Sequence, residues 1–592
     1  MNTPARDLPS WPAMSLAEAH ARLTAPGSRF AMEEVVVAGV STRCWKYAPP
    51  TLRGVLQTGR MYGTRDFLVY EDERVGFEAL WRAVSALAHA LRTLGVAKGD
   101  RVAIVMRNLP EWVAAFYGAA MAGAIVTPLN AWWTGAELEY GLVDSGARIA
   151  VVDAERFERM AGHFVNCPAL ERVLVSRASD ALHHPIAAPL EDVIGCPHDW
   201  ANLPDRDLPD VALAPDDAVT IFYTSGTTGK PKGALGTHRN MNSNIMAAGF
   251  SAARNFLRRG EPVPVLDPFT APQRAGLLSV PFFHATGCFA VLNPALFTGA
   301  KLVLMRRWDV EQALALIERE KVNQAGGVPT IAWQLLEHPS RSNYDLSSLE
   351  SVAYGGAPSA PELVRKIIEV LPNSLPGNGW GMTETSATCT HHSGEDYRHR
   401  PQSCGPPVPV CDLKVVGPDG ALLPPGEVGE LWARGPNIVK GYWNQPQATA
   451  ETFVDGWVKT GDLVRLDDEG FCTIVDRTKD MLIRGGENIY CIEVEHALHE
   501  HPAVMDATLV GIPHHTLGEE PAAVVHLKPG LHTTEEELRA FVAARLAVFK
   551  VPVKIVFWPQ TLPRNANGKV LKSELKSAIG PLTANPAQTR GE

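Results

Sequence analysis

One short segment constrains this chain more than any other: an apolar strand followed at once by a loop of hydroxyl, glycine and lysine side chains. The apolar run covers Ala218–Phe222, and the loop, Tyr223–Gly233, reads Tyr-Thr-Ser-Gly-Thr-Thr-Gly-Lys-Pro-Lys-Gly. Glycines let backbone N–H groups approach an anion, hydroxyls donate further hydrogen bonds, and lysine adds positive charge. The spacing differs from that of a Walker A loop. The segment therefore predicts a phosphate-binding loop at the end of a strand.

Helical and strand patterns alternate through most of the chain. Apolar residues between positions 77 and 94 recur at helical spacing, Gly95 ends that helix, and Arg101–Val105 follows as a buried strand. Such alternation predicts stacked layers with largely parallel sheets. The Gly- and Pro-rich stretch Pro406–Thr473 has short β-like runs. The predicted fold class is α/β: a large N-terminal body of stacked α/β layers plus a β-subdomain, with a small α/β C-terminal domain.

Charge and cysteine usage exclude several classes of protein. Lys and Arg total 55 against 65 for Asp and Glu, a formal net charge of −10, which gives no reason to expect nucleic acid. The nine cysteines include no Cys-x-x-Cys pair, so neither a disulfide framework nor a zinc ribbon is indicated. The opening residues lack the apolar stretch of a secretory signal. We expect a cytoplasmic protein.

The segment Trp112–Trp133 is uncharged over 22 residues, a length that fits a membrane span. Gly118, Gly123 and Pro128 interrupt it, and many of its residues are alanines. We therefore predict a buried helix, a glycine turn and a short strand, and no transmembrane segment.

Further motifs follow the phosphate loop in order along the chain. They are Tyr354–Pro358, Asn378–Glu384, Lys459–Leu463, Asp476–Asp480, Arg484–Tyr490 and Pro563–Lys569. The series resembles the signature of the adenylate-forming superfamily, which includes acyl-CoA synthetases, luciferases and the adenylation domains of peptide synthetases. The resemblance runs from about Val75 to Lys569. It implies an N-terminal AMP-binding (adenylation) domain, residues 1–478, and a C-terminal lid domain, residues 479–592, with a hinge at Lys479.

The resemblance implies that ATP lies on residues from several of these motifs. Trp380 stands where the family has a tyrosine, and its indole offers a large face for stacking on the base. Asp462 would accept hydrogen bonds from both ribose hydroxyls, and Arg477 would face the ribose or a phosphate. The expected ATP-binding residues are Thr224, Ser225, Gly226, Thr227, Thr228, Gly229, Lys232, Gly355, Gly356, Ala357, Pro358, Asn378, Gly379, Trp380, Gly381, Met382, Asp462 and Arg477.

The same resemblance assigns the catalytic, metal and CoA residues. Thr383 would contact a phosphate, and Glu384 would hold Mg²⁺, because a hard cation needs an oxygen ligand. Lys569 would bridge the substrate carboxylate and the α-phosphate and offset the charge developing there. Alone, a lysine after Asn-Gly is usually a surface residue. The hinge Lys479 and the loop residues Gly485, Gly486 and Glu487 would serve the approach of CoA.

Pro281–Gly287 resembles the family's acyl-pocket motif. His284 would lie where the acyl site meets the CoA channel, although a buried structural histidine is the alternative. Val328–Trp333 is an apolar stripe that either lines the same pocket or belongs to the core. The expected acyl-pocket residues are Phe283, His284, Gly287, Val328 and Trp333.

The resemblance implies an ATP-dependent acid–CoA ligase that acts through an acyl-adenylate, with ATP, Mg²⁺ and CoA as cofactor and co-substrates. The apolar wall residues favour a medium- or long-chain aliphatic or aryl-alkanoic acid. Two alternatives stay open: a free-standing adenylation enzyme that loads a carrier protein, and a non-catalytic sensor of nucleotide or acyl-adenylate. The resemblance also permits a homodimer.

Overall fold

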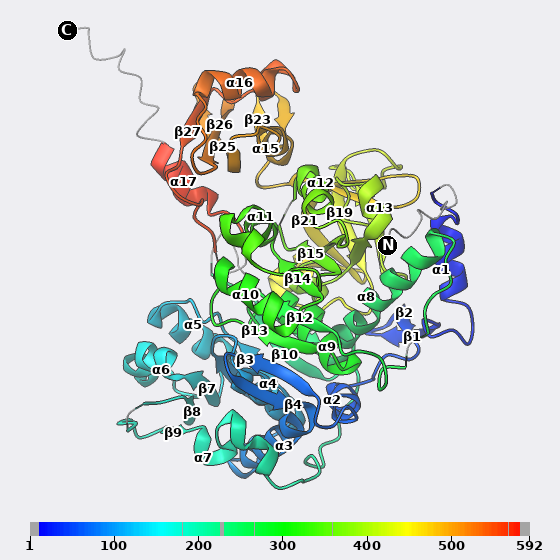
Figure 1. Cartoon of the computed structure of the whole chain (residues 1–592). Coiled ribbons are helices and arrows are strands. Elements are labelled where there is room, and N and C mark those ends of the chain that lie inside the picture. Colours follow the sequence, from blue (N-terminus) through cyan, green and yellow to red (C-terminus); the bar gives the residue numbers. More distant parts are fainter. Residues whose placement is uncertain are drawn as a thin grey trace, which may run out of the picture.

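The computed structural model describes residues 11–179, 181–224, 230–265, 267–357, 359–565 and 568–579. Two large sheets and one smaller antiparallel sheet form the body of the molecule, and a further sheet forms a separate C-terminal domain (Figure 1). A two-stranded hairpin, β1 (Met32–Val37) and β2 (Val40–Trp45), precedes them.

The two large sheets are mainly parallel, with antiparallel strands only at their edges. The first has the order β11 (Gly233–Thr237), β10 (Ala218–Tyr223), β6 (Ile125–Pro128), β5 (Arg101–Val105), β7 (Ile149–Asp153), β8 (Arg172–Ser176) and β9 (Ala187–Pro189). The second has the order β17 (Thr390–Ser393), β16 (Leu375–Trp380), β15 (Ser351–Gly355), β14 (Gln324–Gly327), β12 (Ala275–Leu278), β13 (Lys301–Leu304), β3 (Asp66–Tyr70) and β4 (Glu73–Gly76).

Helices cover these sheets and fill the space between them. The α-helices of the body are α1 (Leu16–Leu23), α2 (Leu52–Arg60), α3 (Phe77–Thr93), α4 (Pro110–Met121), α5 (Gly135–Ser145), α6 (Ala154–Met160), α7 (Glu191–Ile194), α8 (His238–Arg258), α9 (Asn293–Thr298), α10 (Val310–Glu320), α11 (Pro329–Glu337), α12 (Pro361–Val370), α13 (Gly394–His399) and α14 (Pro446–Thr452). A π-helix covers Thr286–Leu292.

Alternating side chains join each central strand to two layers. In β5, Val102 and Ile104 enter the central core, whereas Ala103 and Val105 pack against helices on the outer face. The central core holds α3, α4, α8 and α9 between the two sheets. Helices α5 and α6 cover the outer face of one sheet, and α10, α11 and α12 cover that of the other. The predicted stack of α/β layers is confirmed.

The uncharged segment Trp112–Trp133 is buried from Trp112 to Leu129, whereas Trp132 near its end is exposed. It contains most of α4, a turn at Gly123 with a φ of +89°, and β6. The predicted order of buried helix, glycine turn and strand is therefore confirmed. Across the described residues, no helix combines the length with the apolar character that crossing a bilayer would require.

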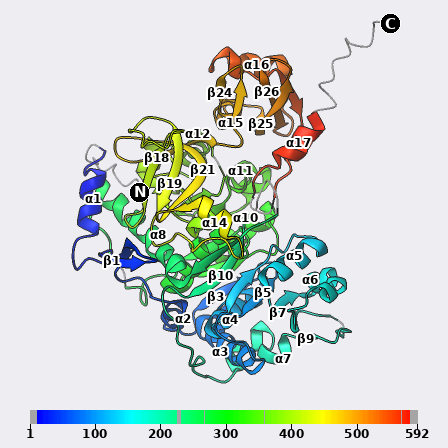
Figure 2. The same ribbon diagram turned by 180° about the vertical axis from the view of Figure 1, so that it is seen from behind.

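The Gly- and Pro-rich stretch forms the smaller sheet of the body. Its strands are β18 (Asp412–Val416), β19 (Gly429–Arg434), β20 (Phe453–Val454), β21 (Trp457–Leu466) and β22 (Cys472–Arg477), all paired antiparallel. Figure 2 shows this sheet in yellow on the same side of the body as α14.

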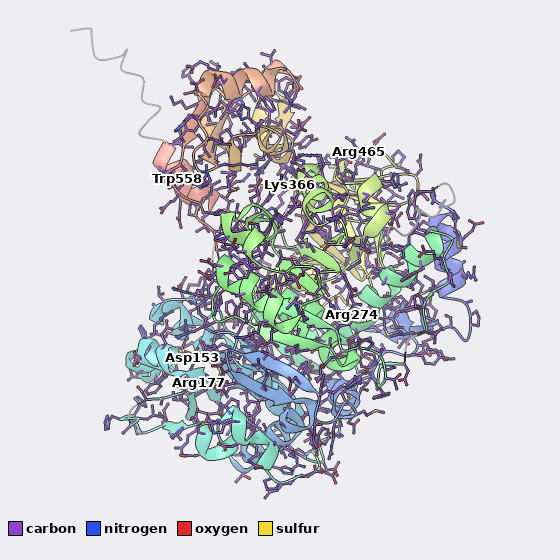
Figure 3. All side chains as sticks on the ribbon, viewed as in Figure 1. Asp153, Arg177, Arg274, Lys366, Arg465 and Trp558 are labelled. Carbon is purple, nitrogen blue, oxygen red and sulfur yellow. The ribbon has the colours of Figure 1, made fainter. Side chains whose placement is uncertain are left out.

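The C-terminal domain has its own sheet and its own apolar core. Its elements are β23 (Leu482–Arg484), β24 (Glu487–Ile489), α15 (Cys491–His499), β25 (Val504–His514), β26 (Gly518–Leu527), α16 (Glu535–Ala543), β27 (Lys554–Phe557) and α17 (Lys572–Ile579). In Figures 1 and 2 it stands at one end of the body. Figure 3 labels Trp558 in this domain, Arg465 in the smaller sheet and Asp153 at the end of β7 in the seven-stranded sheet.

Helix α8 ties the strand after the phosphate loop to the far side of the body. Thr237 caps the helix by accepting a hydrogen bond from the N–H of Asn240, so the helix starts directly after β11. Near the other end, Arg258 Nε donates to Asp396 Oδ1 at 2.8 Å, and Arg254 Nε lies 3.8 Å from Asp396 Oδ2. All three side chains are buried. Asp396 of α13 therefore offsets the charge of two buried guanidinium groups.

Replacing Asp396 by leucine leaves Arg254 and Arg258 buried without this carboxylate. Because an uncompensated buried charge is costly, we expect the free energy of unfolding in urea to fall by about 3–5 kcal/mol. Glu395→Leu is the matched control, since Glu395 pairs with Arg259 at a less buried point of the same helix. That control should lose no more than about 1 kcal/mol. Equal losses in the two variants would contradict the role of Asp396.

Candidate active site

The phosphate loop connects β10 to β11, and the structure describes both of its ends. The N–H of Thr224 donates to the carbonyl of Lys232 at 2.9 Å, and the N–H of Lys232 donates to Thr224 Oγ1 at 3.3 Å. These two bonds close the loop at its base. The predicted contacts of Ser225, Gly226, Thr227, Thr228 and Gly229 lie outside the described residues.

Two parallel strands bring the predicted adenine-binding motifs together. Gly355 of β15 is paired with Gly379 of β16. A Cβ at Gly355 would lie 3.0 Å from the carbonyl oxygen of Gly379, so the missing side chain lets the strand ends approach closely. Gly356 then turns the chain with a φ of +75° toward Ala357. Pro358 lies outside the described residues.

The loop after β16 carries Thr383 and Glu384 and folds back tightly on itself. A Cβ at Gly381 would lie 1.2 Å from the carbonyl oxygen of Ala387, so no residue with a side chain fits there. Met382 precedes a 3₁₀ turn that covers Thr383–Thr385. This turn directs Glu384 into the interior, where it is 7% exposed.

Glu384 is a buried carboxylate with polar and cationic neighbours. The hydroxyl of Tyr442 donates to Glu384 Oε1 at 2.7 Å. Burial raises the pKa of Glu384, and the Tyr442 hydrogen bond and the charges of Lys569 and Lys232 oppose that rise. Because Tyr442 engages one carboxylate oxygen, the other can serve a ligand. A carboxylate oxygen is a donor that Mg²⁺ takes in proteins, so the residue fits the predicted metal ligand.

Trp380 contacts the predicted ribose-binding residue directly. Its Nε1–H donates to Asp462 Oδ2 at 2.7 Å, and Asp462 pairs with Arg477 in the register of β21 and β22. Burial raises the pKa of Asp462, opposed by the Trp380 hydrogen bond and by Arg477. Asn378, two residues before Trp380, donates to the hydroxyl of Tyr397 at 3.2 Å. The indole therefore orients Asp462, a contact that the stacking prediction did not include.

Lys569 belongs to the C-terminal domain and lies near the two carboxylates described above. Its backbone N–H donates to Asn565 Oδ1 at 3.0 Å. The preceding Gly568 has a φ of +73° and packs against Val328 of the body, since a Cβ there would lie 2.8 Å from Val328 Cγ2. A glycine at this position therefore lets the lysine loop approach the body closely.

Charges of both signs surround the ammonium group of Lys569. Burial and the charge of Arg477 lower its pKa, and the carboxylates of Asp462 and Glu384 oppose that change. Lys569 also lies close enough to His284 to act on its protonation. The ammonium of Lys569 thus lies within electrostatic range of Glu384, Asp462 and His284 of the body, which together are called the cluster below.

The predicted CoA residues lie elsewhere in the C-terminal domain. Gly485 and Gly486 form the turn between β23 and β24 with φ values of +60° and +90°, and Glu487 follows. All three are exposed. Lys479 lies in the connection between body and C-terminal domain, where burial and Arg477 lower its pKa. The structure therefore brings Lys569, and not the Gly-Gly-Glu turn, to the cluster.

The predicted acyl-pocket motif follows β12. Phe283 is 7% exposed, and a Cβ at Gly287 would lie 2.2 Å from the carbonyl oxygen of Pro281. The N–H of Thr286 donates to His284 Nδ1 at 3.3 Å. Burial and the charge of Lys569 lower the pKa of His284 to about 4, so this imidazole is neutral at neutral pH.

Helix α11 carries Trp333, and the residue before the helix is Val328. The ring of Trp333 lies 5.8 Å from Lys528 Nζ of the C-terminal domain, and Lys528 forms an ion pair with Glu337 Oε1 at 2.9 Å. Trp333 therefore takes part in the contact between the two domains. A role for Trp333 in the acyl pocket stays a prediction.

Several residues of the site gave no usable sequence signal. Asn244 Oδ1 accepts from the N–H of Thr388 at 2.9 Å, and Asn437 Nδ2 donates to the carbonyl of Thr385 at 3.0 Å. Both asparagines thereby hold the loop that carries Glu384. Tyr442 is equally inconspicuous in the sequence, apart from being an aromatic residue directly after a glycine.

Two family models match the chain. The model described as AMP-binding enzyme covers residues 56–443, and the model described as AMP-binding enzyme C-terminal domain covers residues 493–569. Together they include the phosphate loop, the loop of Glu384 and the segment that ends at Lys569.

Individual relatives agree with the family models. The chain is 33% identical over 508 residues to a feruloyl-CoA synthase of Amycolatopsis sp, across 85% of this chain and 94% of that protein. It is 34% identical over 543 residues to a long-chain-fatty-acid–CoA ligase of Bacillus subtilis (strain 168), across 89% and 94%. The crystal structure of the anthranilate CoA ligase AuaEII in complex with anthranoyl-AMP matches with a TM-score of 0.79 and 25% identity, across 90% of this chain and 98% of that one. The chain therefore belongs to the AMP-binding enzymes of the adenylate-forming superfamily and, among them, to the AMP-forming acid–CoA ligases.

Proposed function

We propose that this ligase converts an apolar carboxylic acid, either a medium- or long-chain aliphatic acid or an aryl-alkanoic acid, to its CoA thioester through an acyl-adenylate. The observation that carries the proposal is the position of Lys569. This cation of the C-terminal domain lies near Glu384 and Asp462 of the body, beside the motif loops in which ATP is expected. A nucleotide bound there would lie between two sets of groups that only the docked C-terminal domain brings together.

In the first step, an oxygen of the acid attacks the α-phosphorus of ATP, the bond to the β-phosphate oxygen breaks, and pyrophosphate leaves. Lys569 holds the acid carboxylate against the α-phosphate and offsets the negative charge that grows there. Thr383 and Lys232 contact the phosphates, and Asp462, oriented by Trp380, accepts bonds from the ribose hydroxyls. The desolvation that raises the pKa of Asp462 also strengthens each of these polar contacts.

Glu384 is the residue that would hold Mg²⁺, and the ion, when bound, supplies positive charge for the departing pyrophosphate. In the second step, the thiol sulfur of CoA attacks the acyl carbon, the bond to AMP breaks, and the thiol proton is lost to solvent. His284 is neutral and lies near Lys569, so it borders the acyl carbonyl without adding charge.

The second step needs a different surface next to the same carbonyl. Lys569 and the turn of Gly485, Gly486 and Glu487 belong to one domain, yet only Lys569 faces the cluster. A rotation of the C-terminal domain about Lys479 would exchange them. A lid that occupies one position per half-reaction accounts for both sets of motif residues.

The names of two relatives support the proposed kinds of acid. They are a feruloyl-CoA synthase and a long-chain-fatty-acid–CoA ligase. The buried Phe283 and the close packing at Gly287 are consistent with an apolar pocket. A homodimer and a cytoplasmic location stay predictions.

Pyrophosphate release with a panel of acids tests the proposal. We expect release with apolar aryl or aliphatic acids to exceed release with acetate, and we expect equimolar acyl-CoA when CoA is present. If no acid causes pyrophosphate release, the proposal is wrong and the protein is a non-catalytic sensor. If pyrophosphate is released but a thioester forms only when a carrier protein is added, the protein is a carrier-loading enzyme.

Lys569→Ala should separate the two half-reactions. Because the ammonium acts on the α-phosphate, we expect acyl-AMP formation to fall by at least about a hundredfold, the scale seen when one transition-state donor is removed. Conversion of supplied acyl-adenylate and CoA to thioester should persist. Lys576→Ala is the control, because Lys576 is an exposed lysine of α17. Equal loss of both half-reactions would refute the role of Lys569.

Lys479→Pro provides the mirror experiment at the hinge. Proline restricts the backbone rotation that exchange of the two surfaces requires. We expect acyl-AMP to form at close to the original rate while thioester formation from supplied acyl-adenylate drops. An intact second step in this variant would show that Lys479 is not the pivot.

The contact between Lys528 and Glu337 should favour the first half-reaction, because it holds the C-terminal domain in the position described. We expect Lys528→Glu to slow acyl-AMP formation by about fivefold or less, as a partly exposed ion pair permits, without slowing thioester formation. The exchanged pair Lys528→Glu with Glu337→Lys should recover the original rate. A double variant that is slower than the single one would contradict this assignment.

A further inference from the structure

Two charged side chains, Glu384 and Lys232, meet at Tyr442. Its hydroxyl donates to Glu384 Oε1 at 2.7 Å, and Lys232 Nζ lies over the same ring, 4.9 Å from the ring centroid. The cation therefore lies against the face of the ring, while the carboxylate lies at its hydroxyl end. In the described part of the chain, Lys232 forms no ion pair with any carboxylate.

The backbone fixes the position of this ring. Tyr442 forms a β-bridge with Ala234, and the N–H of Trp443 donates to the carbonyl of Gly233 at 2.7 Å. The segment of Tyr442 therefore lies antiparallel beside β11, and β11 begins directly after Lys232. On the other side, the N–H of Tyr442 donates to Thr449 Oγ1 at 2.9 Å.

The loop of Glu384 is tied to the same segment. The N–H of Val439 donates to the carbonyl of Glu384 at 3.0 Å, so a backbone hydrogen bond joins the loop of Glu384 to the segment that leads into Tyr442. The ring of Phe453 meets the Tyr442 ring edge to face at a centroid distance of 5.5 Å. Backbone and ring contacts therefore hold Tyr442 independently of its contacts with Glu384 and Lys232.

Lys232 and Glu384 carry opposite charges, and the carboxylate of Glu384 is buried. Opposite charges at low dielectric attract strongly and would form a mutual ion pair if nothing separated them. In such a pair the ammonium would no longer be available to a phosphate, and the carboxylate would no longer be available to a cation. The Tyr442 ring offers each of them a separate partner: a π face for Lys232 and a hydroxyl donor for Glu384.

We infer that Tyr442 is a positioning residue that keeps Lys232 and Glu384 apart and orients the Glu384 carboxylate for the cation that accompanies ATP. The inference rests on the proposed function, because it concerns the ATP site of that reaction. Tyr442 lies outside all the motifs that the sequence shares with the family. Tyr442 itself touches neither phosphate nor acid in this assignment and acts through its two neighbours.

The hydroxyl and the ring make separable contributions. Tyr442→Phe removes the donor and keeps the ring between the two charges. We expect it to weaken ATP binding about tenfold in Mg²⁺, as loss of a hydrogen bond to a charged group does, and to leave ATP binding in EDTA unchanged. Tyr442→Leu removes the separator as well, so ATP binding should weaken in both buffers. Titration calorimetry of the full-length protein with ATP measures all four cases.

A matched control comes from the other side of the phosphate loop. The hydroxyl of Tyr140 donates to the carbonyl of Pro231 at 2.9 Å, and Lys230 Nζ lies 4.9 Å from the centroid of the Tyr140 ring. The hydroxyl of Tyr140 thus serves a backbone carbonyl, whereas that of Tyr442 serves Glu384. Tyr140→Phe should therefore not change the difference between ATP binding in Mg²⁺ and in EDTA. Thioester formation from supplied acyl-adenylate and CoA, which uses no triphosphate, should be retained in Tyr442→Phe.

The outcomes separate this inference from the proposed function. If the original protein binds ATP with Mg²⁺ and Tyr442→Phe binds it equally well, only the inference is overturned. The same holds if Tyr442→Phe weakens binding equally in Mg²⁺ and in EDTA, or if Tyr140→Phe reproduces its effect. If the original protein binds no ATP in either buffer, the proposed function falls and the inference falls with it.

Discussion

The structure of the site depends on the compensation of one buried cation. The ammonium of Lys569 comes from the C-terminal domain, and burial lowers its pKa against the opposing charges of Asp462 and Glu384, which belong to the body. A buried ammonium is costly unless opposite charges lie nearby. The position of the C-terminal domain is therefore coupled to the charge in the site. A polyphosphate would strengthen that coupling, and its departure as pyrophosphate would weaken it.

The carboxylates can play this part because rigid elements hold them. Glycine pairing between β15 and β16 and the contact of Gly381 with Ala387 fold the motif loops closely together. Asn244 of α8 and Asn437 hold the loop of Glu384 from outside. Trp380 and Tyr442 then orient one carboxylate each, Asp462 and Glu384, through a single hydrogen bond. Each site carboxylate therefore has a neutral aromatic donor, which fixes its direction without cancelling its charge.

Periodicity was sufficient to predict the layers of the fold. The strand Arg101–Val105 and the helix Phe77–Thr93 lie where local apolar patterns indicate them, because burial on one or two faces dictates which positions are apolar. Trp112–Trp133 was correctly predicted as buried helix, turn and strand. The motif resemblance located Lys569, Glu384 and Asp462, which the fold brings together across more than one hundred positions of sequence. Tyr442, Lys528 and Glu337 were missed, since their partners are distant in sequence and no local pattern marks them.

The amino-acid sequence by itself determined the order of the motifs and the family, because these depend on residue types at short spacing. Only the tertiary structure decided which motif residues act together in one arrangement. It brings Lys569 to the carboxylates and leaves the turn of Gly485 and Gly486 exposed. It also decided that Trp380 donates to Asp462 and that Tyr442 contacts both Lys232 and Glu384. The physical reason is that hydrogen bonds and charge compensation depend on distances of a few ångströms between elements far apart in the chain, which local periodicity does not encode.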